Sequence, residues 1–167
     1  KLRLSRLSGG VAVLKVGGAT EAELQERRDR VDDALHATQA AIQEGIVPGG
    51  GVALVRSSHF ASKGITLSSP DTGAGMKIVH TACHAPLKQI VLNAGGTPDV
   101  VLEKVLELKK NMGYNASVGA YGDMLSMGII DPLKVVRSAV ENAASSASMM
   151  LTVGCAMVTD LGDLNDE

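Results

Sequence analysis

The stretch IVPGGGVALV, residues 46–55, places three glycines in a row between two segments with helical patterns. A glycine inside a helix costs about 0.5–1 kcal/mol relative to alanine, because the unfolded chain has more freedom to lose. One glycine is enough to end a helix. Three in succession predict either a tight turn or a place where a ligand approaches the backbone closely. On the triplet alone, the turn is the favoured interpretation.

The segment before the triplet predicts a long amphipathic helix over about residues 21–44. Thr20 and Glu23 form a capping-box pattern at its start, and Gly45 follows its end. Farther upstream, VAVLKVG at residues 11–17 is rich in valine and bounded by glycines, so it predicts a strand. Residues recurring at helical spacing predict a buried stripe on the long helix: Leu24, Val31, Leu35, Thr38 and Ile42.

The sequence after the triplet is also mainly helical in pattern. Thr97 and Asp131 each stand before a proline, as N-caps often do, and Pro86 is expected to split or kink the helix that contains it. Residues 63–73 predict a surface loop, and residues 153–161 predict a strand. The expected helices cover about residues 52–61, 76–93, 98–109 and 132–151, with short strands and turns over residues 111–130.

Composition sets limits on the kind of protein. At 167 residues the chain is long enough for one domain and part of another. With one Phe, two Tyr and no Trp, its core is expected to consist of Ala, Val, Leu, Ile and Met. The net charge of −2 gives no electrostatic case for binding nucleic acid or anionic membranes, and no apolar run could span a bilayer. Two cysteines favour a reduced intracellular setting, and the absence of an initial Met favours a fragment.

Common cofactor motifs fail on this sequence. No glycine is followed by the Lys-Ser or Lys-Thr of a Walker A motif, and Leu54 stands where the dinucleotide fingerprint needs its last glycine. His80 and His84 stand one helical turn apart with Cys83 between them, a spacing that can share a metal. No third ligand and no glutamate base accompany them, so two helix histidines beside a buried thiol is the favoured interpretation.

Three polar positions remain as candidates for chemistry. Asp33 stands mid-helix beside Asp32, where aspartate is a poor helix former, although a solvated face explains most such residues. Asn115 stands in a glycine-flanked turn, where asparagine is common. Asp131 can cap a helix with one carboxylate oxygen and bind a ligand with the other.

Six motifs in this order resemble the group I chaperonins, the GroEL-like proteins: GGVAVLKVG, RVDDALHATQAAIQEGIVPGGGVAL, APLKQIVLNAGG, GYNA, GIIDPLKVVRSAVENAAS and AMVTDL. The resemblance spans nearly the whole chain. It implies a mainly α fold, the helical bundle of the chaperonin equatorial domain with a few short β-strands. Residues 1–45 would be the returning part of the intermediate domain, and residues 46–167 the C-terminal half of the equatorial, ATP-binding domain.

The resemblance also implies roles for individual residues. Gly50 would lie against the bound nucleotide, and Asp131 would hydrogen-bond the ribose. Asp33 would be the catalytic residue, which swings in with the intermediate domain and positions the attacking water. The turn that would contact the adenine side consists of Asn115, Ala116 and Ser117.

As a whole, the resemblance implies a fragment of an ATP-dependent chaperone that assists protein folding and takes part in the stress response. The cofactors would be ATP and Mg²⁺, with the phosphate loop and the magnesium ligand in an N-terminal half that this chain lacks. The partners would be further copies in a double-ring homo-oligomer, and a co-chaperonin lid and unfolded clients bound through a missing apical domain. The location would be the cytoplasm or an organellar matrix.

Two departures from the family pattern accompany the resemblance. The loop at residues 63–73 does not follow it, and the usual Gly-Met-rich tail is missing after LNDE. Neither nucleic acid nor membrane is expected as a partner, and the isolated fragment is expected to be inactive as an ATPase. The alternative function is a non-enzymatic helical interaction module, and nucleotide binding discriminates between the two.

Overall fold

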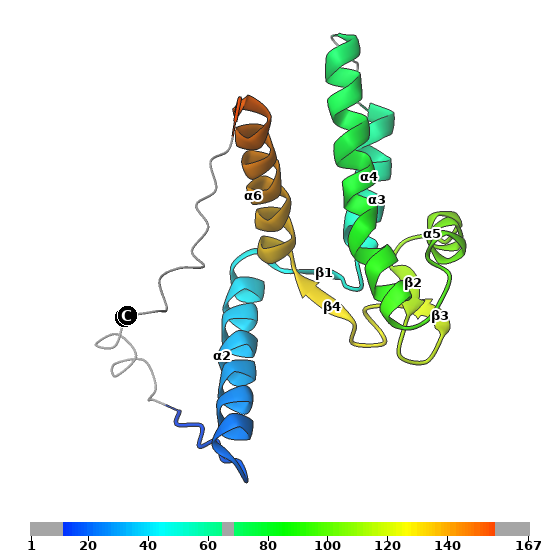
Figure 1. The fold of residues 1–167 in the computed structure, drawn as a ribbon. Helices are drawn as coiled ribbons and strands as arrows, with labels where there is room; N and C mark the ends of the chain where they lie inside the picture. The colour runs from blue at the N-terminus through cyan, green and yellow to red at the C-terminus, as the bar shows by residue number, and fades with distance from the viewer. Residues whose placement is uncertain (1–11, 65–68, 156–167) are drawn as a thin grey trace.

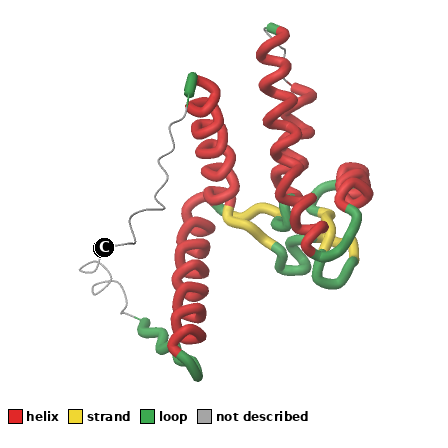
Figure 2. Tube along the Cα trace, viewed as in Figure 1, coloured by secondary structure: helices red, strands yellow, loops and turns green. Residues whose placement is uncertain are grey.

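The structure is a computed structural model that describes residues 12–64 and 69–155. Of the two longest helices, one precedes the glycine triplet and the other follows it, and the strands are short. Figures 1 and 2 show two groups of elements joined by a narrow β-ribbon. The described elements, in chain order, are α2 (Glu21–Glu44), β1 (Ile46–Pro48), α3 (Val52–Gly64), α4 (Pro70–Asn93), α5 (Pro98–Glu107), β2 (Met112–Asn115), β3 (Ala120–Asp123), β4 (Ile130–Pro132) and α6 (Leu133–Thr152). The mainly α fold class is confirmed.

Helix α2 has the bounds that its sequence predicts. The Thr20 hydroxyl accepts a hydrogen bond from the Glu23 amide at 3.2 Å, and Glu23 accepts one from the Ala19 amide at 2.8 Å. At the other end, the Gly45 amide donates to the Ala41 carbonyl at 2.8 Å, and Gly45 has a φ of 86°. Glycine adopts this left-handed conformation without the Cβ penalty, which explains why the helix ends there.

The stripe expected to be buried on α2 is exposed. No residue of α2 is buried, and Ile42 and Leu35 are 81% and 52% exposed. Helix α6 covers a different face, where Lys134 donates to Gln43 at 2.6 Å and Arg137 pairs with Glu44 at 2.7 Å. The prediction was wrong for this chain because an amphipathic stripe is buried only where another surface covers it.

The core lies among α3, α4, α5 and the turn after β3. Val52 and Val55 of α3 are fully buried, and Met124 closes the cluster from the turn. Its other buried members, Leu87, Val91, Val101, Leu102 and Val105, come from α4 and α5. As its composition predicts, this core is aliphatic, with Tyr114 and Tyr121 packed only at its edge.

Two antiparallel pairs of strands complete the fold. Strands β2 and β3 form a hairpin, with Tyr114 opposite Tyr121. Strand β1 pairs with β4, so that Val47 lies opposite Asp131. In Figure 1 this β1–β4 ribbon connects the α2–α6 pair to the group built on α3, α4 and α5. The α2–α6 pair is thereby joined to the group that contains the core through two three-residue strands.

Several predicted boundaries differ from the structure. Residues 12–17 form no strand, because none of the described segments pairs with them. The predicted loop at residues 63–73 is shorter, since α3 continues to Gly64 and Ser69 caps α4 through the Thr72 amide. Helix α4 runs through Pro86 without interruption. Of the predicted strand at residues 153–161, the first three residues are irregular and the rest lies outside the described residues.

Of the two predicted N-caps, one is confirmed and one is wrong. Thr97 is the N-cap residue of α5, which begins at Pro98, although its side chain makes no capping hydrogen bond. Asp131 does not cap α6, because Asp131 and Pro132 belong to β4 and the helix begins at Leu133. Pairing with β1 keeps Asp131 in an extended conformation, and tertiary pairing thus overrides the local signal.

Large apolar side chains remain exposed on several helices. Phe60 on α3 is 82% exposed and Leu151 near the end of α6 is 86% exposed. In Figure 1, α6 stands apart from α3 and α4 along much of its length. Within the described residues, no helix combines the length and apolarity needed to cross a bilayer. The exposed apolar faces are therefore surfaces that another protein segment could cover.

Substituting Gly51 tests the close packing around the triplet. Gly51 has a φ of 78°, and an added Cβ would lie 2.7 Å from the Leu87 backbone nitrogen. We expect Gly51→Ala to lower the free energy of unfolding by about 2 kcal/mol or more, from conformational strain and displacement of α4. Gly75→Ala, mid-helix with no atom within 4 Å of the added Cβ, should instead stabilise by about 0.5–1 kcal/mol. Urea unfolding of both variants checks this, and equal effects would contradict it.

Candidate functional site

The glycine loop, Gly49–Gly51, lies where β1 passes into α3. The Gly49 amide donates to the Ile129 carbonyl at 2.9 Å, which attaches the loop to the segment leading into β4. Gly50 has a φ of 65°, and a Cβ there would lie 3.0 Å from the Met124 side chain and 3.9 Å from the Tyr114 carbonyl oxygen. The loop therefore lies directly beside the β2–β3 hairpin, with its backbone free of side chains.

Asn115 ends β2 and begins the turn of this hairpin. Its side-chain oxygen accepts from the Ser117 amide at 3.0 Å, and its carbonyl accepts from the Gly119 amide at 2.9 Å. Its amide nitrogen lies 3.9 Å from the sulfur of Met127. These contacts fix the orientation of the Asn115 side chain, while Ala116 is half-buried and Ser117 is exposed.

Asp131 is a half-buried carboxylate in the middle of β4. Burial raises the pKa of Asp131 above the usual range for aspartate. In the described part of the chain, its side chain takes part in no ion pair that would offset this cost. It stands two residues after Ile129, the residue that accepts from Gly49. A carboxylate kept half-buried at an energetic cost close to the glycine loop is a candidate binding group.

Asp33 lies apart from the other candidates. It is an exposed residue on α2, eleven positions before the last residue, Glu44, and so about 16 Å along the helix axis from that end. In Figure 1, α2 extends away from the β1–β4 ribbon and from the hairpin. The structure thus brings the neighbourhoods of Gly50, Asn115 and Asp131 together but does not bring Asp33 to them.

Residues 4–160 match the TCP-1/cpn60 chaperonin family, which is nearly all of the chain. The chain belongs to that family. Its described helices and short strands fit the mainly α chaperonin fold, and the match supports a role in protein folding for the chaperonin as a whole.

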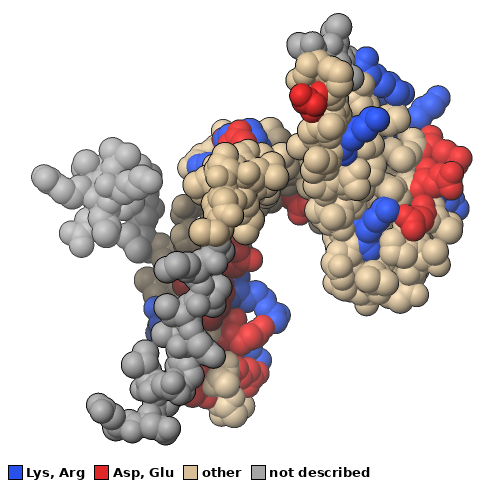
Figure 3. Space-filling model, turned by 45° about the horizontal axis from the view of Figure 1, so that its top comes forward, with Lys and Arg blue, Asp and Glu red and all other residues tan. Residues whose placement is uncertain are grey.

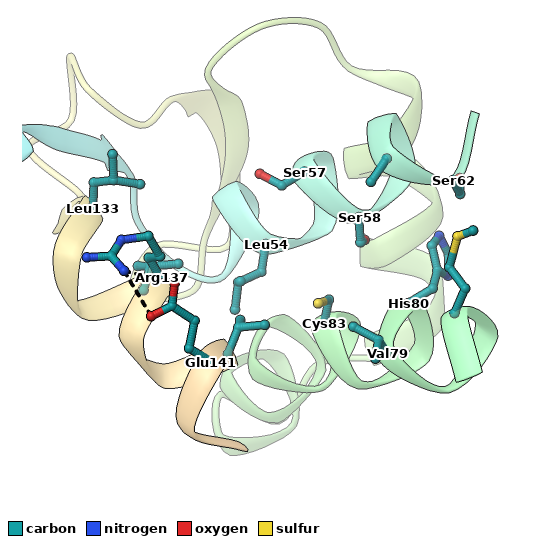
Figure 4. Close-up of a pocket in the computed structure, with 14 residues that line it drawn as sticks. Leu54, Ser57, Ser58, Ser62, Val79, His80, Cys83, Leu133, Arg137 and Glu141 are labelled. Atoms are coloured by element: carbon teal, nitrogen blue, oxygen red, sulfur yellow. Dashed lines mark hydrogen bonds and ion pairs between the residues drawn. The ribbon is translucent and has the colours of Figure 1, made fainter. Parts of the chain in front are cut away.

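One groove of this chaperonin chain lies away from the glycine loop. It has a volume of about 370 Å³ between α3, α4 and the start of α6, and none of the candidate site residues lines it. Figure 4 shows Ser58, His80 and Cys83 beside this groove, with the Arg137–Glu141 ion pair on the α6 side. Its lining is mainly apolar, so it fits a packing surface better than a nucleotide site.

His80 and His84 of the chaperonin chain lie one turn apart on α4 and contact each other. The rings of His80 and His84 meet edge to face with their centroids 4.5 Å apart. Burial, aided by the charge of His80, lowers the pKa of His84, and burial raises the pKa of the Cys83 thiol. Across residues 12–64 and 69–155, no three His, Cys, Asp or Glu side chains come together as ligands for a metal.

The face of the molecule in Figure 3 carries both positively and negatively charged side chains. Lysine and arginine lie beside aspartate and glutamate on both groups of elements. The Arg137 guanidinium contacts two carboxylates, Glu44 at 2.7 Å and Glu141 at 2.8 Å. The hydrogen bond from Arg137 lowers the pKa of Glu44. This ion pair attaches the end of α2 to α6 beside Gly45.

Sequence patterns missed two features of this neighbourhood. Met124 lies under Gly50 but is one of seven methionines, with no pattern to mark it. The β1–β4 pairing was also missed, because each strand is only three residues long. The β-branched residues Val47 and Ile130 were the available signal, although weak at this length.

Replacing the Asp131 carboxyl tests its burial. The pKa of Asp131 is higher in the folded chain than in the unfolded chain, where the pKa of aspartate is about 3.9, so protonated Asp131 favours the folded state. This contribution is fully present below the unfolded pKa and is lost as pH rises through the folded pKa. Asp131→Asn, which cannot ionise, should therefore be more stable than wild type at pH 7, and the difference should shrink below about pH 4. Urea unfolding across this range measures it. A gain for Asp131→Asn that persists at low pH, or an equal gain for the exposed control Asp32→Asn, would contradict the expectation.

Proposed function

We propose that this chain carries the nucleoside side of the ATP site of a group I chaperonin. The observation that carries the proposal is that the glycine loop contacts residues close in sequence to Asn115 and Asp131. The Gly49 amide donates to the carbonyl of Ile129, and a Cβ at Gly50 would lie 3.9 Å from the carbonyl oxygen of Tyr114. Gly50 offers bare backbone on which a flat ligand can lie, and the Asn115–Ser117 turn offers polar groups at its edge. Asp131 offers a carboxylate, the acceptor that a ribose hydroxyl prefers.

The same residues do not fit the phosphates or a magnesium ion. Phosphate binding needs convergent amides or cationic side chains, and Mg²⁺ needs carboxylate oxygens in octahedral positions. Among Gly50, Asn115, Ala116, Ser117 and Asp131 there is one carboxylate and no lysine or arginine. We therefore assign the phosphate loop and the magnesium ligand to another part of a complete subunit, and no step here depends on the metal.

The proposal extends to domain assignment and assembly. Residues 1–45 are assigned to the intermediate domain and residues 46–167 to the equatorial domain. The apolar side chains exposed on α4 and α6 support burial against further parts of the subunit or against other copies in a ring. Client proteins and a co-chaperonin lid would bind through an apical domain, in the cytoplasm or an organellar matrix.

In this proposal Asp33 supplies the chemistry. Phosphoanhydride hydrolysis depends mostly on positioning and electrostatic stabilisation, so a carboxylate that orients the attacking water has a large effect. Because Asp33 lies far along α2, it must reach the nucleotide through movement of that helix. Gly45, with its left-handed φ and no atom within 4 Å of an added Cβ, is a suitable pivot.

A competing function is a non-enzymatic interaction module. The apolar groove between α4 and α6, lined by alanines, Val140 and Ile78, is the observation that favours it. Measuring ATP binding discriminates between the two proposals. A module that only packs against partners has no affinity for ATP, whereas a nucleoside site binds ATP weakly even without the phosphate loop.

The isolated chain should not hydrolyse ATP. None of the residues proposed for the nucleoside site would hold the transferring phosphoryl group or neutralise its developing charge. Release of phosphate by the purified chain with Mg²⁺ is the measurement. Turnover that persists after all co-purifying full-length chaperonin has been removed would contradict this expectation.

In a chaperonin subunit that joins this chain to the missing phosphate loop, Asp33→Ala should retain nucleotide binding and lose most hydrolysis. Water-positioning and general-base residues contribute about 10²–10⁴-fold, or roughly 3–5 kcal/mol of barrier. Single-turnover hydrolysis beside ATP affinity measures both effects.

Asp32→Ala is the matched control for this substitution. Its side chain points about 100° away around the helix, so it should leave hydrolysis largely intact. If Asp32→Ala slows hydrolysis as much as Asp33→Ala, or if Asp33→Ala mainly weakens binding, Asp33 is not the residue that positions water.

A further inference from the structure

Arg56 makes a set of contacts that no motif in the sequence indicates. It stands on α3, five residues after Gly51, with a half-buried side chain. Its guanidinium donates three hydrogen bonds to backbone carbonyls: to Met112 at 2.7 Å, to Leu108 at 2.9 Å and to Val105 at 3.3 Å. One side chain therefore joins α3 to the end of α5 and to the first residue of β2.

The acceptors of Arg56 are groups that the backbone cannot satisfy by itself. Val105 lies in the last turn of α5 and Leu108 is its C-cap residue, where helix carbonyls lack intrahelical partners. These carbonyls form the negative end of the helix dipole, which favours a cation. The planar guanidinium presents its donors in a fixed fork, which suits carbonyls from two segments.

The contact with Met112 adjoins the place where the hairpin meets the glycine loop. At the next residue, Gly113, an added Cβ would lie 2.5 Å from the Val52 side chain at the start of α3. The carbonyl of the following residue, Tyr114, faces Gly50. Asn115 comes next in the strand, so a shift of β2 along α3 would change the distance between Asn115 and Gly50.

We propose that Arg56 is a positioning residue that sets the spacing between the glycine loop and the Asn115 turn. The inference rests on the proposed nucleotide site for its functional consequence. Arg56 acts through the backbone and not on the ligand, because both terminal nitrogens already donate to carbonyls and Nε is buried with no partner among the described residues. It holds the two sides of the nucleoside site at a fixed separation before ligand binds.

Hydrogen exchange and ATP binding of the chain test this proposal with three variants. Arg56→Met keeps the aliphatic stem and removes every donor, whereas Arg56→Lys keeps the charge and part of the donor set. Arg30→Met, at an exposed arginine on α2, is the control. In Arg56→Met, amides of residues 112–123 should exchange roughly tenfold faster, as expected when charge-assisted hydrogen bonds are lost locally. ATP affinity should fall severalfold, and amides of α2 should not change.

Rescue separates positioning from general stability. Arg56→Lys should lie between wild type and Arg56→Met in both exchange and affinity. Unchanged exchange in residues 112–123 of Arg56→Met overturns the proposal, as does faster exchange with unchanged ATP affinity. An Arg56→Lys variant no better than Arg56→Met, or an Arg30→Met variant with the same effects, also overturns it.

Two further outcomes have defined meanings. If Arg56→Met does not fold, Arg56→Lys decides: faster hairpin exchange with weaker ATP binding supports the proposal, and wild-type behaviour overturns it. If the wild-type chain binds no ATP up to millimolar concentrations, the proposed function fails. Arg56 is then judged by exchange alone, and faster exchange confined to residues 112–123 still supports its role in holding the hairpin.

Discussion

Three other segments close on the glycine loop, two of them with backbone and one with a side chain. A Cβ at Gly49 would lie 3.1 Å from the Ile129 backbone, and one at Gly51 would lie 2.7 Å from the backbone of Leu87. At Gly50 the neighbour is the end of the Met124 side chain, 3.0 Å from an added Cβ. The positions of α4, the hairpin and β4 relative to one another thus follow from three missing side chains, and with them the place of Asp131.

Local signals predicted the parts of the fold whose partners are near in sequence. The bounds of α2 follow from Thr20, Glu23 and Gly45, which all act within one helical turn of its ends. Signals that depend on distant partners failed. Asp131 has the local pattern of an N-cap, but pairing with Val47 places it in a strand. Residues 12–17 have the composition of a strand and no partner among the described segments.

The candidate site also combines features that the local sequence indicates with features that depend on distant contacts. The glycine triplet has a cost that must be explained, but on its own it favours a turn. The site roles of Gly50, Asn115 and Asp131 all rest on the family motifs. No local pattern could show that Asp131 is half-buried or that Arg56 joins two segments, since both depend on tertiary contacts. The role of Asp33 rests on the resemblance and on a movement of α2, which one conformation does not contain.

The β1–β4 ribbon also has a consequence for the order of folding. Val47 has no strand partner until Asp131, 84 residues later in the chain, has been synthesised. During synthesis at about 5–20 residues per second, that interval is roughly 4–17 s. Contacts among α3, α4, α5 and the hairpin are closer in sequence and form at lower entropic cost, so they are expected to be complete first. Until β4 and α6 have been synthesised, the end of α2 lacks the contacts with these two elements that hold it in the complete fold.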